Sequence, residues 1–506
     1  MVAAENDALI RGKVGGLADV VRDLPRALID LGLSVDVITP AYGFLQNENP
    51  SELHATVDFP FKGKRQSAAV FRVKTKTPHE RVSCFVVEHP DLRGNPIYYN
   101  DPPATPFLRD AEKYALFSSA VGKILGWQEE TYALHLHDWH SGFLFLLQRR
   151  HPEFAHLQKI RTLYTIHNIG VQGTRPFEGN TSTVTSWFPE LFASKDWIEE
   201  WQDPQWDVPC FNPMLAGIRH ADALNTVSPG YAEEILHPSD HANGFFGGEG
   251  LERELNERKK EGALSGILNG CEYPPAPGYL RMSCDELLGF LQQEIRRSSG
   301  VLKGASAVHL EALRQFKPEF ILTGVTRIVE QKVQLFLEHG SDGRSAIERL
   351  VDLLAEQNGA CVLLGSGIPE YEEKFIALTE KNRRFVFIRG YSEKISEALY
   401  ANGTLFLMPS SFEPCGISQM IAMREGQPCV VHAVGGLRDT VTDGLNGFTF
   451  DGKNPRQQVD AFVGAVTRAV RWYLEDKARW EAVRNAALRA RFTWESSARR
   501  YLELLG

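Results

Sequence analysis

Short runs of apolar and β-branched residues recur along the chain, and most of them end in a loop that carries polar residues or glycine. The runs occupy residues 34–43, 83–90, 132–140, 161–170, 223–230 and 265–270 in the first half, and 319–327, 360–367, 383–391, 403–410 and 427–436 in the second. Buried parallel strands that alternate with helices produce this spacing. The sequence therefore predicts an α/β protein with two doubly wound, Rossmann-like domains, in which ligands bind outside the carboxyl ends of the strands.

Two nearly identical phrases open a predicted helix, "KVGGLADVV" at 13–21 and "AVGGLRDTV" at 433–441. Glycines allow close approach of the backbone, and the unpaired N–H groups of a first helical turn favour a phosphate. The two glycine pairs, Gly15-Gly16 and Gly435-Gly436, therefore predict anion sites in two related domains that face one ligand across a central cleft.

A chain of 506 residues exceeds the size at which a single core stops growing. The pattern of strands breaks where three prolines and a glycine follow one another within 271–286. We therefore predict a first domain over 1–272, on the acceptor side of the cleft, and a linker over 273–318 with a helical segment from about 285 to 316. The second domain, on the donor side, is expected over 319–485, and a last helix over 486–506 is expected to pack back toward the first domain.

The charge balance of 55 Lys and Arg against 64 Asp and Glu, a formal net charge of -9, argues against nucleic acid or an anionic membrane as a partner. The seven cysteines are odd in number and show no C-x-x-C spacing, which favours a reducing, cytoplasmic setting. We find no apolar run long enough to span a bilayer and no secretory signal in the first residues.

Polar side chains gather just after the predicted strands. They are Lys13, His137, Asp138, Trp139, His140, His167, Asn168 and Asn269 in the first half, and Arg327, Lys332, Ser366, Tyr391 and Glu413 in the second. Three of these side chains are cations that can neutralise a leaving group with about two negative charges. Carboxylate, histidine and amide groups suit sugar hydroxyls. Together they predict a site for a diphosphate joined to a polyol.

Each of these residues also has a simpler interpretation. Arg327 and Lys332 taken alone are typical of solvated surface charges, and Glu413 is typical of an acid that complements a helix dipole. The histidines of "HLHDWH" could form a zinc site, but they have no cysteine partner and no H-E-x-x-H spacing. We therefore expect no metal and no bound cofactor.

Ten phrases occur in one order along the chain: "KVGGLADVV", "HLHDWHSGF", "YTIHNIGVQG", "NTVSPGYAEEI", "GILNG", "TRIVEQK", "GSGIPEYEEKF", "RGYSEKISEALY", "MPSSFEPCGISQMIAMREG" and "AVGGLRDTV". In these phrases the chain resembles the bacterial glycogen synthases and plant starch synthases. The resemblance implies a GT-B fold and transfer of glucose from ADP-glucose to the non-reducing end of an α-1,4-glucan, with retention of configuration. It also implies that cations of the protein replace a metal, and we find no D-x-D pair that would hold one.

The resemblance implies a role for individual residues. Donor-binding residues would be Lys13, Gly15, Gly16, Asp19, Asn269, Arg327, Lys332, Tyr391, Gly435 and Gly436. Residues at the transferred glucose or the acceptor would be Tyr98, Asp138 and His167. The catalytic set would be Asp138, His167, Arg327, Lys332 and Glu413.

The chain departs from the family pattern in several places. It has Val14 where threonine is usual, Cys271-Glu272 where Ile-Asp is usual, and Ile368 where aspartate is usual, and its first strand is nearly absent. The alternatives are a synthase that uses UDP-glucose and a non-catalytic relative that binds nucleotide sugar or glucan. A glucan phosphorylase would need a much longer chain and a lysine that binds pyridoxal phosphate.

Overall fold

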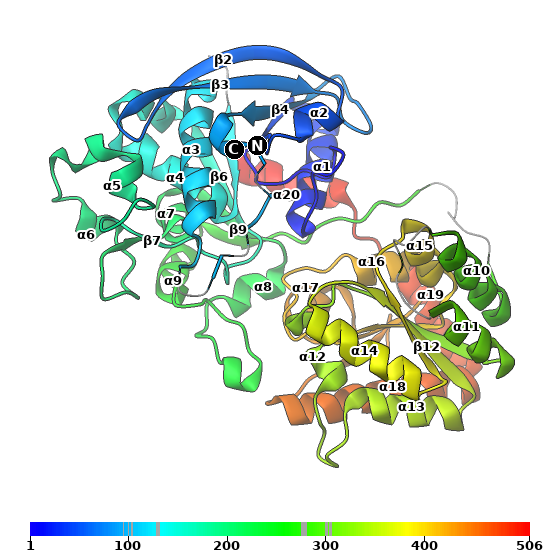
Figure 1. Ribbon diagram of the computed structural model, residues 1–506. Coiled ribbons are helices and arrows are strands. Elements are labelled where there is room, and N and C mark those ends of the chain that lie inside the picture. Colours follow the sequence, from blue (N-terminus) through cyan, green and yellow to red (C-terminus); the bar gives the residue numbers. More distant parts are fainter. Residues whose placement is uncertain are drawn as a thin grey trace.

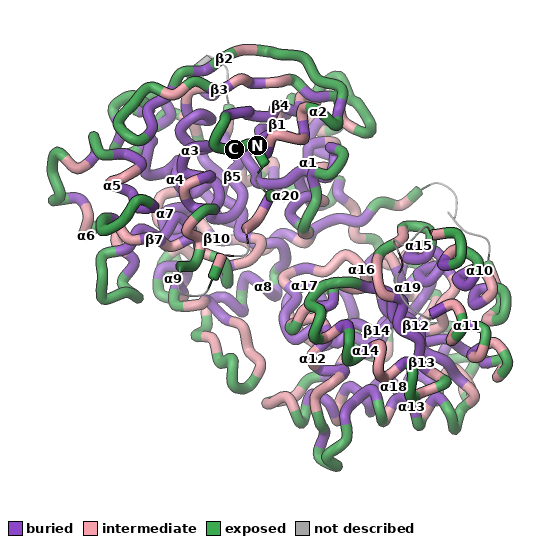
Figure 2. Tube along the Cα trace, viewed as in Figure 1, coloured by how far each residue is buried: buried purple, intermediate pink, exposed green. Residues whose placement is uncertain are grey.

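The structure, a computed structural model, describes residues 1–94, 96–99, 101–102, 105–127, 132–274, 281–298, 302 and 306–506. The chain forms two lobes, one coloured from blue to green together with the red C-terminal helix, and the other from green through yellow to orange-red (Figure 1). Strands fill the centre of each lobe, and the tube in Figure 2 shows that these central segments are mostly buried.

The first domain is built on one continuous sheet. Its strands are β1 (Val35–Pro40), β2 (Ser51–Phe61), β3 (Lys64–Val73), β4 (Val82–Glu88), β5 (Ala133–His137), β6 (Arg161–Ile166), β9 (Ala223–Thr226) and β10 (Leu264–Gly266). They lie in the order β10-β9-β6-β5 and β1-β4-β3-β2. Val2 joins the two parts, because it bridges both Ile38 of β1 and Leu136 of β5. The short strands β7 (Arg175–Pro176) and β8 (Cys210–Phe211) pair separately.

The second domain has a six-stranded sheet in which every pairing is parallel. Its strands are β11 (Phe320–Val325), β12 (Gly359–Gly365), β13 (Phe385–Arg389), β14 (Leu405–Met408), β15 (Cys429–His432) and β16 (Phe448–Phe450). They lie in the order β13-β12-β11-β14-β15-β16, so the direction of winding reverses beside β11. Such a switch point is where doubly wound sheets bind ligands. Each of the eleven predicted runs coincides with one strand to within one residue at its start or contains it, and the predicted fold class is confirmed.

Helices cover both faces of the two sheets. In the first domain they are α1 (Gly16–Asp30), α2 (Leu45–Glu48), α3 (Leu108–Ile124), α4 (Asp138–Arg150), α5 (Val184–Trp187), α6 (Ile198–Trp201), α7 (Pro213–His220), α8 (Pro229–Glu234) and α9 (Glu252–Lys260). The others are α10 (Cys284–Arg297), α11 (Ser306–Gln315), α12 (Glu330–Leu337), α13 (Ala346–Glu356), α14 (Pro369–Lys381), α15 (Glu393–Asn402), α16 (Ser418–Arg424), α17 (Gly435–Thr440), α18 (Pro455–Glu475), α19 (Lys477–Arg489) and α20 (Trp494–Leu505). No helix in these described ranges is both long and apolar enough to cross a membrane.

The predicted linker over 273–318 differs from the structure in its helical part. Two helices, α10 and α11, form there in place of one, and their apolar side chains share a buried cluster with β12, β13 and α15. Burial of one face of each helix makes this segment part of the second domain. Residues 275–280, 299–301 and 303–305 of the predicted linker lie outside the described residues. The last helix, α20, returns to lie against α1 and β6 of the first domain (Figure 1).

Candidate functional site

The end of β5 places an aspartate in an unusual backbone conformation. Asp138 begins α4 directly after β5, with a φ of 52° in the left-handed region that residues other than glycine seldom adopt. Its buried carboxylate accepts a hydrogen bond from the backbone N–H of His167, at 2.7 Å, in the loop after β6. Burial raises the pKa of Asp138 to about 7. Backbone strain and a costly buried carboxyl at one position are typical of a functional site.

Histidines line the same edge of the sheet without carrying charge. His137 Nδ1 lies 3.0 Å from His167 Nε2, and burial lowers the pKa of His167 to about 3. A neutral imidazole at neutral pH can exchange hydrogen bonds with a hydroxyl group. His135 is held by Thr165 at 2.6 Å. Across the described ranges, no group of three or more His, Cys, Asp or Glu side chains is arranged to hold a metal ion.

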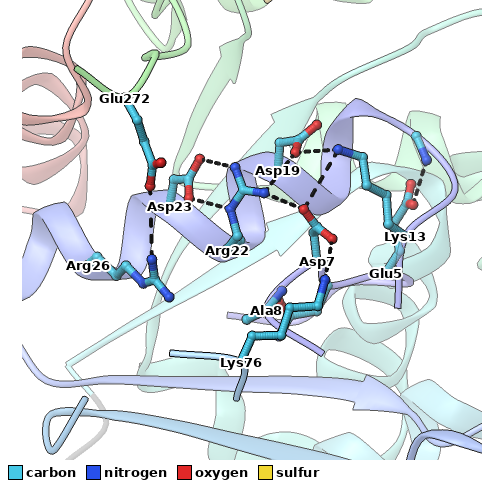
Figure 3. Close-up of polar contacts among 12 residues, drawn as sticks. Glu5, Asp7, Ala8, Lys13, Asp19, Arg22, Asp23, Arg26, Lys76 and Glu272 are labelled. Carbon is cyan, nitrogen blue, oxygen red and sulfur yellow. Dashed lines mark hydrogen bonds and ion pairs between the residues drawn. The ribbon is translucent and has the colours of Figure 1, made fainter. Parts of the chain in front are cut away.

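Lys13 lies in a network of charges at the first helix (Figure 3). Its Nζ is 2.5 Å from Asp19 Oδ1 and 3.7 Å from Asp7 Oδ2. Arg22 also pairs with both carboxylates, so each of these two aspartates is shared between cations. A diphosphate that binds Lys13 must therefore compete with Asp19, and Arg22 remains beside Asp19 when Lys13 turns away.

A buried carboxylate already occupies part of the first glycine loop. Glu5 accepts the backbone N–H groups of Val14 at 2.6 Å and Gly15 at 2.7 Å, and the hydroxyl of Tyr98 donates to it at 3.0 Å. Tyr98 thus supports the loop through Glu5, and its predicted place near the sugar stays a prediction. Open space lies in front of Gly16, where α1 begins. Of this glycine pair, Gly16 is therefore the one that an anion can approach.

In the second domain, a lysine and a glutamate that are far apart in sequence form a buried pair. Lys332 of α12 makes an ion pair with Glu413, which lies in the loop after β14. Their side chains are 11% and 9% exposed. The hydroxyl of Ser410 donates to Glu413 at 3.1 Å, and Lys332 Nζ donates to the carbonyl oxygen of Phe412 at 3.3 Å. Burial lowers the pKa of Lys332, and the charge of Glu413 opposes that shift.

Three other predicted site residues also follow strands, and one of them, Arg327, interacts with this pair. Arg327 follows β11, is exposed, and is close enough to Lys332 to lower its pKa electrostatically. Tyr391 follows β13 with 61% of its surface exposed, so its ring is accessible to a base. Asn269 follows β10 and is buried, and among the described residues its Oδ1 has no hydrogen-bond partner. A buried acceptor of this kind favours a donor group on a ligand.

Both backbone amides of the second glycine pair, Gly435-Gly436, already donate hydrogen bonds within the protein. Gly435 has a φ of 42°, and a Cβ at this position would lie 2.1 Å from the carbonyl oxygen of Glu413. Its backbone N–H donates to Glu234 of the first domain at 2.7 Å, and the N–H of Gly436 donates to the Glu413 carbonyl oxygen at 3.1 Å. The expectation that both glycine pairs present free amides to one ligand therefore does not hold for Gly435 and Gly436, nor for Gly15, whose amide donates to Glu5. The pair instead fixes the backbone of Glu413 against the first domain.

The two domains meet beside Glu413. Phe412 packs its ring against Tyr231 and Phe246 of the first domain, with centroids 5.6 Å and 5.1 Å apart. Sequence reasoning missed Glu5, Tyr231 and Glu234. The last two lie in the phrase "SPGYAEE", which belongs to the family pattern, but no chemistry in that phrase distinguishes them from packing residues.

Comparisons with known proteins agree with this geometry. Residues 1–257 match the family described as the starch synthase catalytic domain, and residues 342–486 match glycosyl transferases group 1. The chain is 32% identical to a glycogen synthase of Gloeobacter violaceus, over 97% of this chain and 95% of that protein. It is also 32% identical to a glycogen synthase of Exiguobacterium sibiricum, with the same coverage.

Solved structures of glycosyltransferases also resemble this chain. The catalytic domain of starch synthase IV from Arabidopsis thaliana, bound to ADP and acarbose, is 25% identical with a TM-score of 0.74, and the match covers 100% of this chain and 97% of that one. A sucrose-phosphate synthase from Thermosynechococcus elongatus shares the fold. It is 19% identical with a TM-score of 0.55, and the match covers 99% of this chain and 96% of that one. The predicted resemblance is confirmed, and the chain belongs to the glycogen and starch synthase family of glycosyltransferases with the GT-B fold.

Proposed function

We propose that this protein transfers glucose from ADP-glucose to the non-reducing end of an α-1,4-glucan, with retention of configuration. The observation that carries the proposal is the buried pair of Lys332 and Glu413 at the ligand-binding edge of the second sheet. The first domain offers Asp138 and the neutral His167, which suit the hydroxyl groups of a sugar. Sequence relatives named glycogen synthase support the substrate class.

The charges account for how the reaction would be accelerated. As the bond between glucose and the diphosphate breaks, negative charge grows on the leaving group. Lys332 and Arg327 then bind it more strongly than they bind the intact donor, which lowers the barrier. When Lys332 turns toward the phosphates it leaves Glu413, whose carboxylate becomes available to the transferred glucose. In this mechanism the cations do the work of a metal ion.

Retention would follow from attack on the same face as the departing diphosphate. A double displacement needs two carboxylates about 5 Å apart on either side of the sugar. Asp138 and Glu413 belong to different domains and each is held by its own neighbours. We infer that the leaving phosphate accepts the proton of the glucan hydroxyl. Closure of the cleft would exclude water, which competes with that hydroxyl.

We also propose a cytoplasmic setting. All seven cysteines lie in the described residues and none of them forms a disulfide bond. Five have a pKa raised by burial to about 11 or above, so they are unreactive thiols at neutral pH.

A transfer assay tests the proposed function. Purified protein is incubated with glycogen and either radiolabelled ADP-glucose or UDP-glucose, and the labelled glucan is digested with an enzyme specific for α-1,4 bonds. We expect transfer from ADP-glucose and release of label by the digestion. The Glu413→Gln variant, which keeps the shape of the side chain, should lose transfer. Transfer from UDP-glucose alone would correct the donor, and a protein that binds glycogen but transfers from neither donor would be the non-catalytic relative.

A further inference from the structure

The proposed site has two halves, a first half-site of Asp138 and His167 in the first domain and a second half-site of Lys332 and Glu413 in the second domain. A short helix of the first domain lies where these two half-sites meet. Helix α8 lies between the two lobes, next to α17 of the second domain (Figure 1). Three of its side chains, those of the N-cap Ser228, Tyr231 and Glu234, are buried. Each of the three contacts a loop that carries a residue of the proposed site. The mechanism above uses none of them.

Tyr231 contacts both half-sites with one side chain. On the side of the first domain, its hydroxyl oxygen accepts the backbone N–H of Ile169 at 2.9 Å, in the loop that also carries His167. On the side of the second domain, its ring packs edge-on against Phe412, the neighbour of Glu413. Tyr231 is fully buried, so neither contact is exchanged with water.

The two ends of α8 hold the Glu413 loop by its backbone. The hydroxyl of Ser228 donates to the carbonyl oxygen of Pro414 at 2.5 Å. At the other end, Glu234 accepts the N–H of Gly435 at 2.7 Å, and the next residue along, Gly436, donates its N–H to the carbonyl oxygen of Glu413.

Side chains of the second domain also bind α8. Asp439 of α17 accepts the backbone N–H of Gly230 at 2.6 Å, so α8 and α17 each supply a carboxylate to the first turn of the other. Arg438 Nη2 lies 3.5 Å from Glu234 Oε1. Contacts made in both directions fix the position of α8 relative to both loops, because neither loop can shift without losing a buried hydrogen bond.

We propose that α8 sets the separation between the Asp138–His167 half-site and Glu413, with Tyr231 and Glu234 as positioning residues for glucosyl transfer. The inference rests on the proposed function for its kinetic part. The contacts of Tyr231 and Glu234 are with Ile169, Phe412 and the Gly435 amide, so their loss should misplace the reacting groups and leave the binding of each substrate in place. A misplacement of about 1 Å can lower a rate about 100-fold.

Kinetics of matched variants test the proposal. Tyr231→Phe removes one hydroxyl, and Glu234→Ala removes the acceptor of the Gly435 amide. Each variant should lower kcat at least about 10-fold, with the KM for ADP-glucose and the affinity for ADP changed less than about threefold. Glu234→Gln keeps an acceptor for the amide and should restore most of kcat. Glu233→Ala is the control on the same helix, because Glu233 is exposed and pairs with Lys259 on the surface.

Hydrogen exchange separates positioning from the reaction itself. In Glu234→Ala, whose lost contact is on the second domain, backbone exchange should rise in residues 161–172 of the first domain as well as in 433–441. Exchange that rises only in 433–441, together with a wild-type kcat, would overturn the proposal. If the wild-type protein transfers no glucose, the proposed function fails, and the exchange at 161–172 alone decides whether α8 couples the half-sites.

Discussion

Replacing Asp138 with asparagine removes an ionisable group from the first domain and keeps the shape of the side chain. The amide oxygen of asparagine can still accept the N–H of His167, and asparagine tolerates the left-handed conformation of position 138. Only the charge is lost. Asp138→Asn therefore isolates the energetic consequence of a buried carboxyl at the site.

The magnitude follows from the pKa of Asp138. Burial raises this pKa from an ordinary value of 3.8 to about 7. At about 1.4 kcal/mol per pKa unit, the difference corresponds to about 4 kcal/mol. Because the folded state holds the proton more tightly than the unfolded state, this contribution to the free energy of unfolding is fully present below about pH 4. It is lost as the pH rises from there through about 7.

Urea unfolding at pH 5 and pH 8, followed by tryptophan fluorescence, measures the effect. Relative to the wild-type protein, Asp138→Asn should gain about 3 kcal/mol of stability between pH 5 and pH 8, because only the two pH units between 5 and the folded pKa of about 7 contribute over this range. Transfer activity should fall. Glu5 is the ionisable neighbour that raises the pKa of Asp138 electrostatically, and it titrates in both proteins. A difference in stability between the two proteins that stays constant from pH 5 to pH 8 would refute the reasoning.

Two further predictions concern the charges of the second domain. Arg327→Ala and Lys332→Ala should each lose about 2 to 4 kcal/mol of transition-state stabilisation, seen in steady-state kinetics as a fall in kcat larger than the rise in KM for the donor. Arg383 is an exposed arginine before β13, so Arg383→Ala is the control and should change neither kcat nor KM. If kcat/KM is unaltered in both Arg327→Ala and Lys332→Ala, the assignment of these residues to the phosphates has no basis. Because protein cations replace a metal in the proposed mechanism, transfer should also survive excess EDTA; activity that EDTA abolishes and manganese or zinc restores would contradict this.

The sequence by itself determined the class of fold. Strands of a parallel sheet are buried on both faces, so each appears as a continuous apolar run, and β11 and β12 illustrate this with almost fully buried residues. The hairpin of β2 and β3 was not predicted from the sequence. Its strands lie at the edge of the first sheet with many exposed residues, and they show no such run.

The sequence also indicated most positions of the candidate site. The carboxyl ends of parallel strands meet at one edge of a sheet, so residues that follow the runs, such as Asp138 and His167, could be selected without a structure. In the structure the carboxylate of Asp138 accepts the backbone N–H of His167 at 2.7 Å, and their roles at the transferred glucose stay a prediction. The sequence did not predict the charge state of these groups. The pKa of Asp138 is raised to about 7 by burial, and burial depends on which residues pack around the carboxyl group in the folded protein.

Only the tertiary structure decided which residues hold the site together. Glu234 binds an amide that lies 201 residues further along the chain, and Ser228 binds a carbonyl group 186 residues away. Local patterns record whether a residue suits a helix or a strand, and glutamate suits a helix whether or not another domain lies beside it. The partner exists only after both domains have folded and met, since packing between distant segments of the chain is what brings the Gly435 amide to that carboxylate.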